Sequence, residues 1–151
     1  MNVKRTRKGD FVVKLDTQER TVLAEVAPQL RAMLDGDLAD PALRRLFPTA
    51  YADDPERDRE YHALVRDELA DRRRAAIETF VATIERDRLS EDELTAWMTA
   101  VNDLRLVLGT RLDVSEETGL VIDPADPDAP LLALYGWLGW LLETIVGALA
   151  S

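Results

Sequence analysis

The sequence predicts a mainly α fold, a single-domain orthogonal bundle of five to six helices with a small N-terminal β-hairpin. Three observations predict it. Apolar residues recur at three- and four-residue spacing along most of the chain, as on the inward face of a helix. Helix-capping side chains precede several of these stretches. An alternating strand pattern occurs only near the N-terminus. We therefore expect one domain over residues 1–151, with a hairpin over 1–15 and a helical body over 16–151.

The hairpin is predicted by two short alternating segments, residues 3–7 and 11–15, on either side of Gly9. A glycine there can take the positive φ that tight turns require. The same segment carries a local basic strip on an otherwise acidic chain: Lys4, Arg5, Arg7, Lys8 and Lys14. We interpret the strip as a solvated edge strand that its charges protect from pairing. The functional alternative is a contact with phosphate or with an acidic partner.

The first long helix is predicted to begin after Asp16 or Thr17, whose side-chain oxygens can cap it. Glu19 then places an acid in the first turn, where the helix dipole favours negative charge. The apolar spacing continues to Gly36, where the helix should end. Pro28 lies inside this stretch and is expected to bend the helix.

Two Asp-Pro pairs predict the next helix starts, because an aspartate N-cap followed by proline is a favoured beginning. Asp40 precedes a short helix over residues 41–46, and Asp54 precedes a longer apolar stripe. That stripe is interrupted by charge, so we expect a break near residues 66–74 and two helices. The three consecutive arginines at the break are interpreted as a solvated face: Arg72, Arg73 and Arg74.

The central helix is predicted to open with the capping box Ser90-x-x-Glu93 and to contain the run NDLRLVLGTRL, residues 102–112. Residues 119–122 could form a short strand that joins the hairpin. A proline-containing acidic loop follows, and residues 131–150 form the last helix.

Charged residues on the apolar central run need partners, since an unpaired buried charge costs several kcal/mol. Helical spacing points Arg105 inward beside Gly109, and Glu143 of the last helix shares a face with Gly136, Gly139 and Gly147. We therefore expect these two faces to pack together and Arg105 to pair with Glu143. The whole predicted network, which we interpret as structural, consists of Arg105, Glu143, Asp103, Arg111, Asp40 and Asp54.

The last helix is apolar on every side and is long enough for a membrane span. Glu143 lies inside it, no basic residue flanks it and an acidic loop precedes it, so we expect a buried core helix and no membrane. A helix apolar all round is either central or shared with a partner. We expect it to be central. The alternative is a homodimer or partner interface that uses Trp137, Trp140 and Leu141.

Composition excludes several functions. The chain has no cysteine, so it has no disulfide, thiolate metal site or thiol chemistry. The single histidine, His62, is interpreted as a surface residue, and we expect no metal and no cofactor. A net charge of -10 opposes binding to nucleic acid. Phosphate-loop, nucleophile-elbow and zinc-protease motifs are absent, so no catalytic residue is assigned.

Three segments resemble an actinobacterial family described as domain of unknown function 2017: DPALRRLFPTAYADDPERDREY, Trp97 with NDLRLVLGTRL, and YGWLGWLLE. The resemblance covers nearly the whole chain. It implies a cytoplasmic, mainly helical regulator, often encoded near a proteolytic adaptor. Some members are linked to oxidation-sensing control of transcription through cysteines. This sequence has none, so thiol sensing cannot be carried over.

Three functions remain open at this point. The first is a non-enzymatic, cytoplasmic regulator that binds a protein, in transcriptional or stress control. The second is a DNA-binding regulator that uses the basic strip, and the third is an enzyme of unrecognised type. The acidic body of the protein favours the first.

Overall fold

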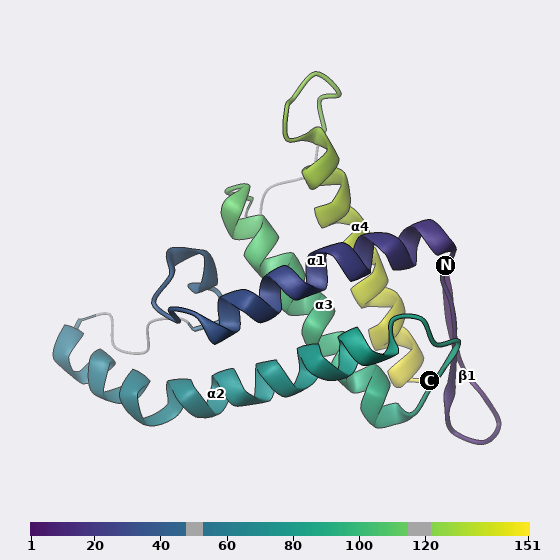
Figure 1. Ribbon diagram of the computed structural model, residues 1–151, viewed down its shortest axis with the longest axis horizontal. Coiled ribbons are helices and arrows are strands. Elements are labelled where there is room, and N and C mark those ends of the chain that lie inside the picture. Colours follow the sequence, from purple (N-terminus) through teal and green to yellow (C-terminus); the bar gives the residue numbers. More distant parts are fainter. Residues whose placement is uncertain (48–52, 115–121) are drawn as a thin grey trace.

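The computed structural model describes residues 1–47, 53–114 and 122–151, without the side chains of residues 62–64 (Figure 1). It confirms a mainly α fold with a small N-terminal sheet. The elements, in chain order, are β1 (Asn2–Arg5), β2 (Phe11–Lys14), α1 (Thr17–Asp35), the 3-10 helix η1 (Pro41–Leu43), α2 (Pro55–Thr83), β3 (Arg88–Leu89), α3 (Glu91–Arg111) and α4 (Ala129–Leu149).

The sheet is antiparallel with the order β1-β2-β3, so β1 is an edge strand. Val3 pairs with Val13, and Phe11 pairs with Leu89. Gly9 takes a φ of 91°, as the predicted turn requires. The third strand was expected at residues 119–122, of which 119–121 lie outside the described residues. Among the described residues, the third strand of the sheet comes from the connection between α2 and α3.

Helix α1 begins with a full capping box, in which Asp16 Oδ1 accepts from the Glu19 amide at 2.7 Å and Glu19 Oε1 accepts from the Asp16 amide at 2.9 Å. The helix continues through Pro28 to Asp35. At the next predicted start, Asp40 caps a single 3-10 turn. Both aspartate caps predicted from the Asp-Pro pairs are therefore present, since Asp54 also accepts from the Arg57 amide.

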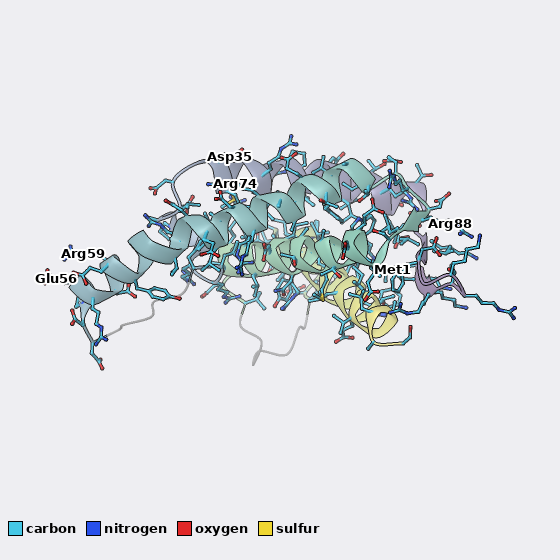
Figure 2. All side chains as sticks on the ribbon, turned by 90° about the horizontal axis from the view of Figure 1, so that it is seen from below. Met1, Asp35, Glu56, Arg59, Arg74 and Arg88 are labelled. Atoms are coloured by element: carbon cyan, nitrogen blue, oxygen red, sulfur yellow. The ribbon has the colours of Figure 1, made fainter. Side chains whose placement is uncertain are left out.

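The predicted break at residues 66–74 is wrong, because α2 is one continuous helix of 29 residues. The arginines do not interrupt it, since arginine is a good helix former and each guanidinium has a partner. Arg72 is solvated and pairs with Glu68 one turn earlier. Arg74 lies 3.2 Å from Asp35 and donates to the Leu34 carbonyl at 2.7 Å (Figure 2), so it caps the end of α1.

Helix α3 is the centre of the bundle, with α2 on one side, α4 on another and α1 crossing it (Figure 1). Its Trp97 is fully buried and donates from the indole N–H to Thr83 Oγ1 at 2.7 Å. The Phe80 and Trp97 rings pack edge to face, with their centroids 4.8 Å apart. Aromatic pairs of this geometry contribute beyond their buried area, so α2 and α3 are joined at the middle of the core.

Helix α4 is not central, contrary to the expectation from its all-round apolarity. It packs on α3 and on β1, and only 28% of its most apolar 18-residue window is buried. By length and composition alone, α4 could cross a membrane. Its inward face nevertheless completes the core, through Tyr135, Leu138, Leu141, Ile145 and Ala148.

Candidate functional site

The buried charge of the central run is Asp103, whose side chain is 1% exposed. Arg73 of α2 donates from Nη1 to Asp103 Oδ1, and Arg73 Nη2 also donates to the Leu46 carbonyl at 3.3 Å. Asp103 Oδ2 is buried and has no hydrogen-bond partner among the described residues. Burial raises the pKa of Asp103 to about 6, although the charge of Arg73 acts in the opposite direction.

Arg73 was interpreted from the sequence as part of a solvated face, and that interpretation is wrong. The helical spacing of α2 contained a signal that could have found it. Arg73 lies four residues after Leu69 and four before Ile77, which both face inward, whereas Arg72 lies beside this stripe and remains exposed. An inward arginine and an inward aspartate on neighbouring helices are each other's natural partner.

The expected pairing of Arg105 with Glu143 is wrong, because no such ion pair lies among the described residues and Glu143 is exposed. Arg105 instead donates to Asn102 Oδ1, on its own helix, at 3.1 Å and approaches the Tyr135 hydroxyl at 3.5 Å. The expected packing of the two faces holds at one position. A Cβ placed on Gly139 would lie 3.7 Å from Arg105 Cδ, whereas Gly147 faces open space.

Gly109 allows a close approach of α3 to its neighbours. A Cβ at this position would lie 2.7 Å from Tyr135 Cε2 and 3.0 Å from Arg45 Nη1. Arg45 reaches past Gly109 and donates to the Val114 carbonyl at 2.6 Å. The missing side chain therefore makes room for α4 and for the segment after η1 at once.

The remaining members of the predicted network have other roles. Asp40 and Asp54 are the N-caps described above and contact neither Arg105 nor Arg111 among the interactions of the described residues. Arg111 is exposed and donates to Met33 Sδ at 3.3 Å. A thioether is a weak acceptor, and within the described ranges Arg111 has no carboxylate partner.

Arg111 lies at the rim of an apolar cleft between α1, α3 and α4, with a volume of about 280 Å³. Its walls are aliphatic, with Met33 and Gln29 on the α1 side and Leu131 exposed on the α4 side. No residue of this cleft other than Arg111 was singled out from the sequence. A cleft formed by three helices has no local sequence pattern, because each helix contributes only part of one face.

Of the three residues of the predicted interface, only Trp140 is open to solvent, at 57% exposure. Leu141 is fully buried in the core, so its assignment to an interface is wrong. Trp137 is half-buried, and its indole N–H donates to Glu19 Oε2 of α1 at 3.2 Å. Trp137 therefore joins α4 to the start of α1.

The basic strip is divided between two faces of the sheet. Lys4 and Lys14 are exposed on the outer face, whereas Arg5 turns inward, over the Phe11 ring at 4.7 Å and onto the Leu149 carbonyl at 3.1 Å. The acid Asp10 also lies in this region, where it pairs with Arg88. The hydroxyl of Thr6 lowers the pKa of the Asp10 carboxyl.

The described residues contain no group of three or more histidine, cysteine, aspartate or glutamate side chains that could hold a metal ion. His62, the single histidine, belongs to the residues whose side chains are not described. Asp103 is thus the one described carboxyl with a pKa raised toward neutrality, and its single hydrogen bond comes from Arg73.

These observations define a mainly α protein whose accessible features are an apolar cleft and an exposed apolar helix face. The chain belongs to the family described as domain of unknown function DUF2017, whose model matches residues 1–149. It is 33% identical, over 158 residues, to the oxidative stress regulator AosR of Mycobacterium tuberculosis and to that of Mycobacterium bovis, and the matches cover 91% of this chain and 72% of each relative.

A further relative, the putative oxidative stress regulator AosR of Mycobacterium leprae, is 31% identical over 129 residues, which cover 74% of this chain and 59% of that protein. No solved structure matches the chain. The family membership predicted from the three sequence segments is confirmed. Relatives that are named as regulators support a regulatory role for this chain.

Proposed function

We propose that this chain is a non-enzymatic, cytoplasmic regulator in stress control, and that it acts by binding a helix of another protein in the cleft between α1, α3 and α4. The observation that carries the proposal is the cleft itself. Its walls are apolar, and its rim holds the guanidinium of Arg111, which has no carboxylate partner among the described residues.

The chemistry of the cleft fits an amphipathic partner helix. Such helices place their apolar face in a hydrophobic groove. A carboxylate on that helix would pair with Arg111, whose one hydrogen bond among the described residues goes to the sulfur of Met33. Methionine adapts to the shape of its neighbour, so Met33 suits a wall that must fit a partner.

The size of the cleft favours protein side chains over a small molecule. At about 280 Å³, it lies at the lower limit of the roughly 300–1,000 Å³ that is typical of ligand pockets. A few apolar side chains from one helix face would fill it. The lack of cysteine means that any response to stress works by a route other than thiol oxidation in this chain.

Two charge reversals test the proposal in the native cell. Tagged wild-type protein, Arg111→Glu and Lys14→Glu are purified with their bound proteins, which mass spectrometry identifies. Both positions are exposed, so both variants should fold, and both change the net charge equally. We expect a protein that the wild type and Lys14→Glu retain and that Arg111→Glu loses.

Two results would contradict the proposal. One is a set of bound proteins that Arg111→Glu leaves unchanged. The other is nuclease-sensitive capture that Lys14→Glu abolishes, which would assign the function to DNA binding by the basic strip. Because phosphate contacts weaken steeply as salt rises, a salt titration of that capture would confirm this second outcome.

A further inference from the structure

The outer face of α4 carries large apolar side chains that are open to solvent. Trp140 is 57% exposed and Val146 is 46% exposed. At about 100° per residue, Trp140, Glu143 and Gly147 fall on one narrow strip, directly opposite the buried Leu141 and Ile145. An exposed tryptophan on a helix face is typical of an interaction site, because aromatic residues are enriched at interfaces.

The two ends of α4 carry opposite charges. The exposed loop before its first turn contributes Asp123, Asp126 and Asp128, with no basic residue. Its last turn lies beside the N-terminal hairpin, where Lys4 and Lys8 are exposed (Figure 1). A second α4 that runs in the opposite direction would bring each acidic end against a basic end. A parallel neighbour would bring like charges together.

We propose that a second copy of this chain docks antiparallel on the outer face of α4, so that Trp140 of each copy lies over the turn from Glu143 to Gly147 of the other. In such a two-fold interface, the same patch must complement itself. Along the helix, Trp140 and Glu143 lie at equal distances on either side of the midpoint between Leu141 and Leu142. With the two-fold axis at that point, each indole N–H faces the carboxylate of the other copy.

The surface beside Gly147 offers room for the indole. A groove of about 420 Å³ runs between β1 and the C-terminal half of α4, with Thr144, Gly147 and Ser151 on the helix side and Lys4 on the strand side. A Cβ on Gly147 would meet nothing within 4 Å. Because helix side chains lean toward the N-terminus, Trp140 of an antiparallel copy projects toward this groove.

The same contact satisfies the one charge of the helix. Glu143 is the only charged residue of α4 and is exposed on its apolar face. In the described part of the chain, the Trp140 indole N–H donates to no acceptor, unlike the indoles of Trp97 and Trp137. The dimer gives each of these groups a hydrogen-bond partner in a location from which water is excluded.

The dimer face is separate from the cleft of the proposed function. The cleft is lined by Leu131, Leu134 and Leu138, which lie on the opposite side of α4 from Trp140. A copy on the outer face therefore leaves the cleft accessible. The experiments can therefore contradict the proposed dimer and support the proposed function of the cleft, or the reverse.

Sedimentation velocity over a wide concentration range tests the dimer. We expect the wild type to shift from monomer to dimer as concentration rises. Trp140→Ala should raise the dimer dissociation constant at least tenfold, since tryptophan is the typical hot-spot residue. Gly147→Leu should remain monomeric, because its side chain occupies the groove, although its Cβ meets nothing within 4 Å in its own copy. Unchanged helical circular dichroism of both variants would exclude unfolding as the cause.

Cysteine crosslinking tests the relative direction of the two α4 helices. Because the sequence contains no cysteine, every disulfide involves an introduced thiol. Ala133 is exposed near the start of α4, on the same flank as Trp140, and Ser151 is exposed two residues beyond its end. A mixture of Ala133→Cys and Ser151→Cys proteins should form the mixed disulfide under mild oxidation.

Three results would overturn the proposal. The first is a strict monomer at every concentration. The second is a preference for disulfides within each single variant, which indicates a parallel pair. The third is a monomer that binds phosphatidylcholine vesicles through Trp140, detected by a blue shift of its fluorescence that Trp140→Ala removes. That result would assign the face to a lipid surface.

Discussion

Gly109 of α3 faces the ring of Tyr135 of α4 so closely that a Cβ on the glycine would lie 2.7 Å from Tyr135 Cε2. The same Cβ would lie 3.0 Å from Arg45 Nη1, on another side of the glycine. Gly109→Ala must therefore push α4 or Arg45 away. We expect it to lower the free energy of unfolding by about 1–3 kcal/mol, the usual cost of overpacking. Urea denaturation measures this change.

Gly139→Ala is the matched control for that variant. Its Cβ would meet Arg105 Cδ at 3.7 Å, an ordinary contact, and alanine is a better helix former than glycine. We expect no loss of stability and a gain of up to about 1 kcal/mol. If both variants lose the same amount, the effect comes from helix composition or the interface in general, and the close approach at Gly109 is not its cause.

Arg20 is a buried arginine that joins α1 to the sheet and to the connection after α2. Its guanidinium donates to four carbonyl oxygens and one carboxylate: those of Leu15, Val13, Ile84, Arg86 and Asp87. Arg20→Met leaves these acceptors without a donor, so we expect it to lower the free energy of unfolding by about 2–4 kcal/mol. Thermal unfolding by calorimetry would measure the loss.

Arg72→Met provides the comparison for Arg20→Met, because among the described residues Arg72 makes a single, exposed ion pair, with Glu68. Such i, i+4 pairs contribute about 0.3–0.5 kcal/mol. An Arg20→Met protein as stable as the Arg72→Met protein would show that the Arg20 contacts do not hold the sheet to the bundle.

Asp103 makes stability depend on pH. Its pKa is about 6 in the folded protein and near 3.8 when unfolded, so the folded state binds the extra proton between these values. The contribution of this proton on Asp103 to the free energy of unfolding is complete below pH 3.8. It is lost as the pH rises through 6. Asp103→Asn cannot titrate. Relative to this variant, the free energy of unfolding of the wild type should fall by about 1.4 kcal/mol between pH 5 and pH 7.5.

Urea denaturation of both proteins at the two pH values gives this difference, because the other carboxyls are common to both and cancel. A difference that stays constant would show that Asp103 keeps an ordinary pKa. A difference of the opposite sign would show that the charge of Arg73 outweighs the cost of burial.

The fold class was predictable because its signals are local. The cap at Asp16, the capping box at Ser90 and the turn at Gly9 depend on residues only a few positions apart. The sequence does not predict the continuity of α2, because charged residues interrupt its apolar stripe. In the structure, Arg73 and Arg74 have partners on α3 and α1. Those partners are distant in sequence, so no local pattern reveals them.

The site was only partly predictable for the same reason. Spacing placed Arg105 beside the last helix, but it could not show that Glu143 points to solvent. The all-round apolarity of α4 was compatible with a central or a shared helix, and only the position of its neighbours decides between them. The cleft at Arg111 exists because three helices leave space between them, which is a property of their packing.

Site-specific photo-crosslinking in the native cell tests the central claim most directly. A photoreactive residue replaces Leu131, which is exposed at the cleft, or Arg59, at the far end of α2 (Figure 2). Binding in the cleft predicts one defined protein crosslinked from position 131, absent from position 59 and lost when Arg111→Glu is added. The same products from both positions, or none from position 131, would contradict it.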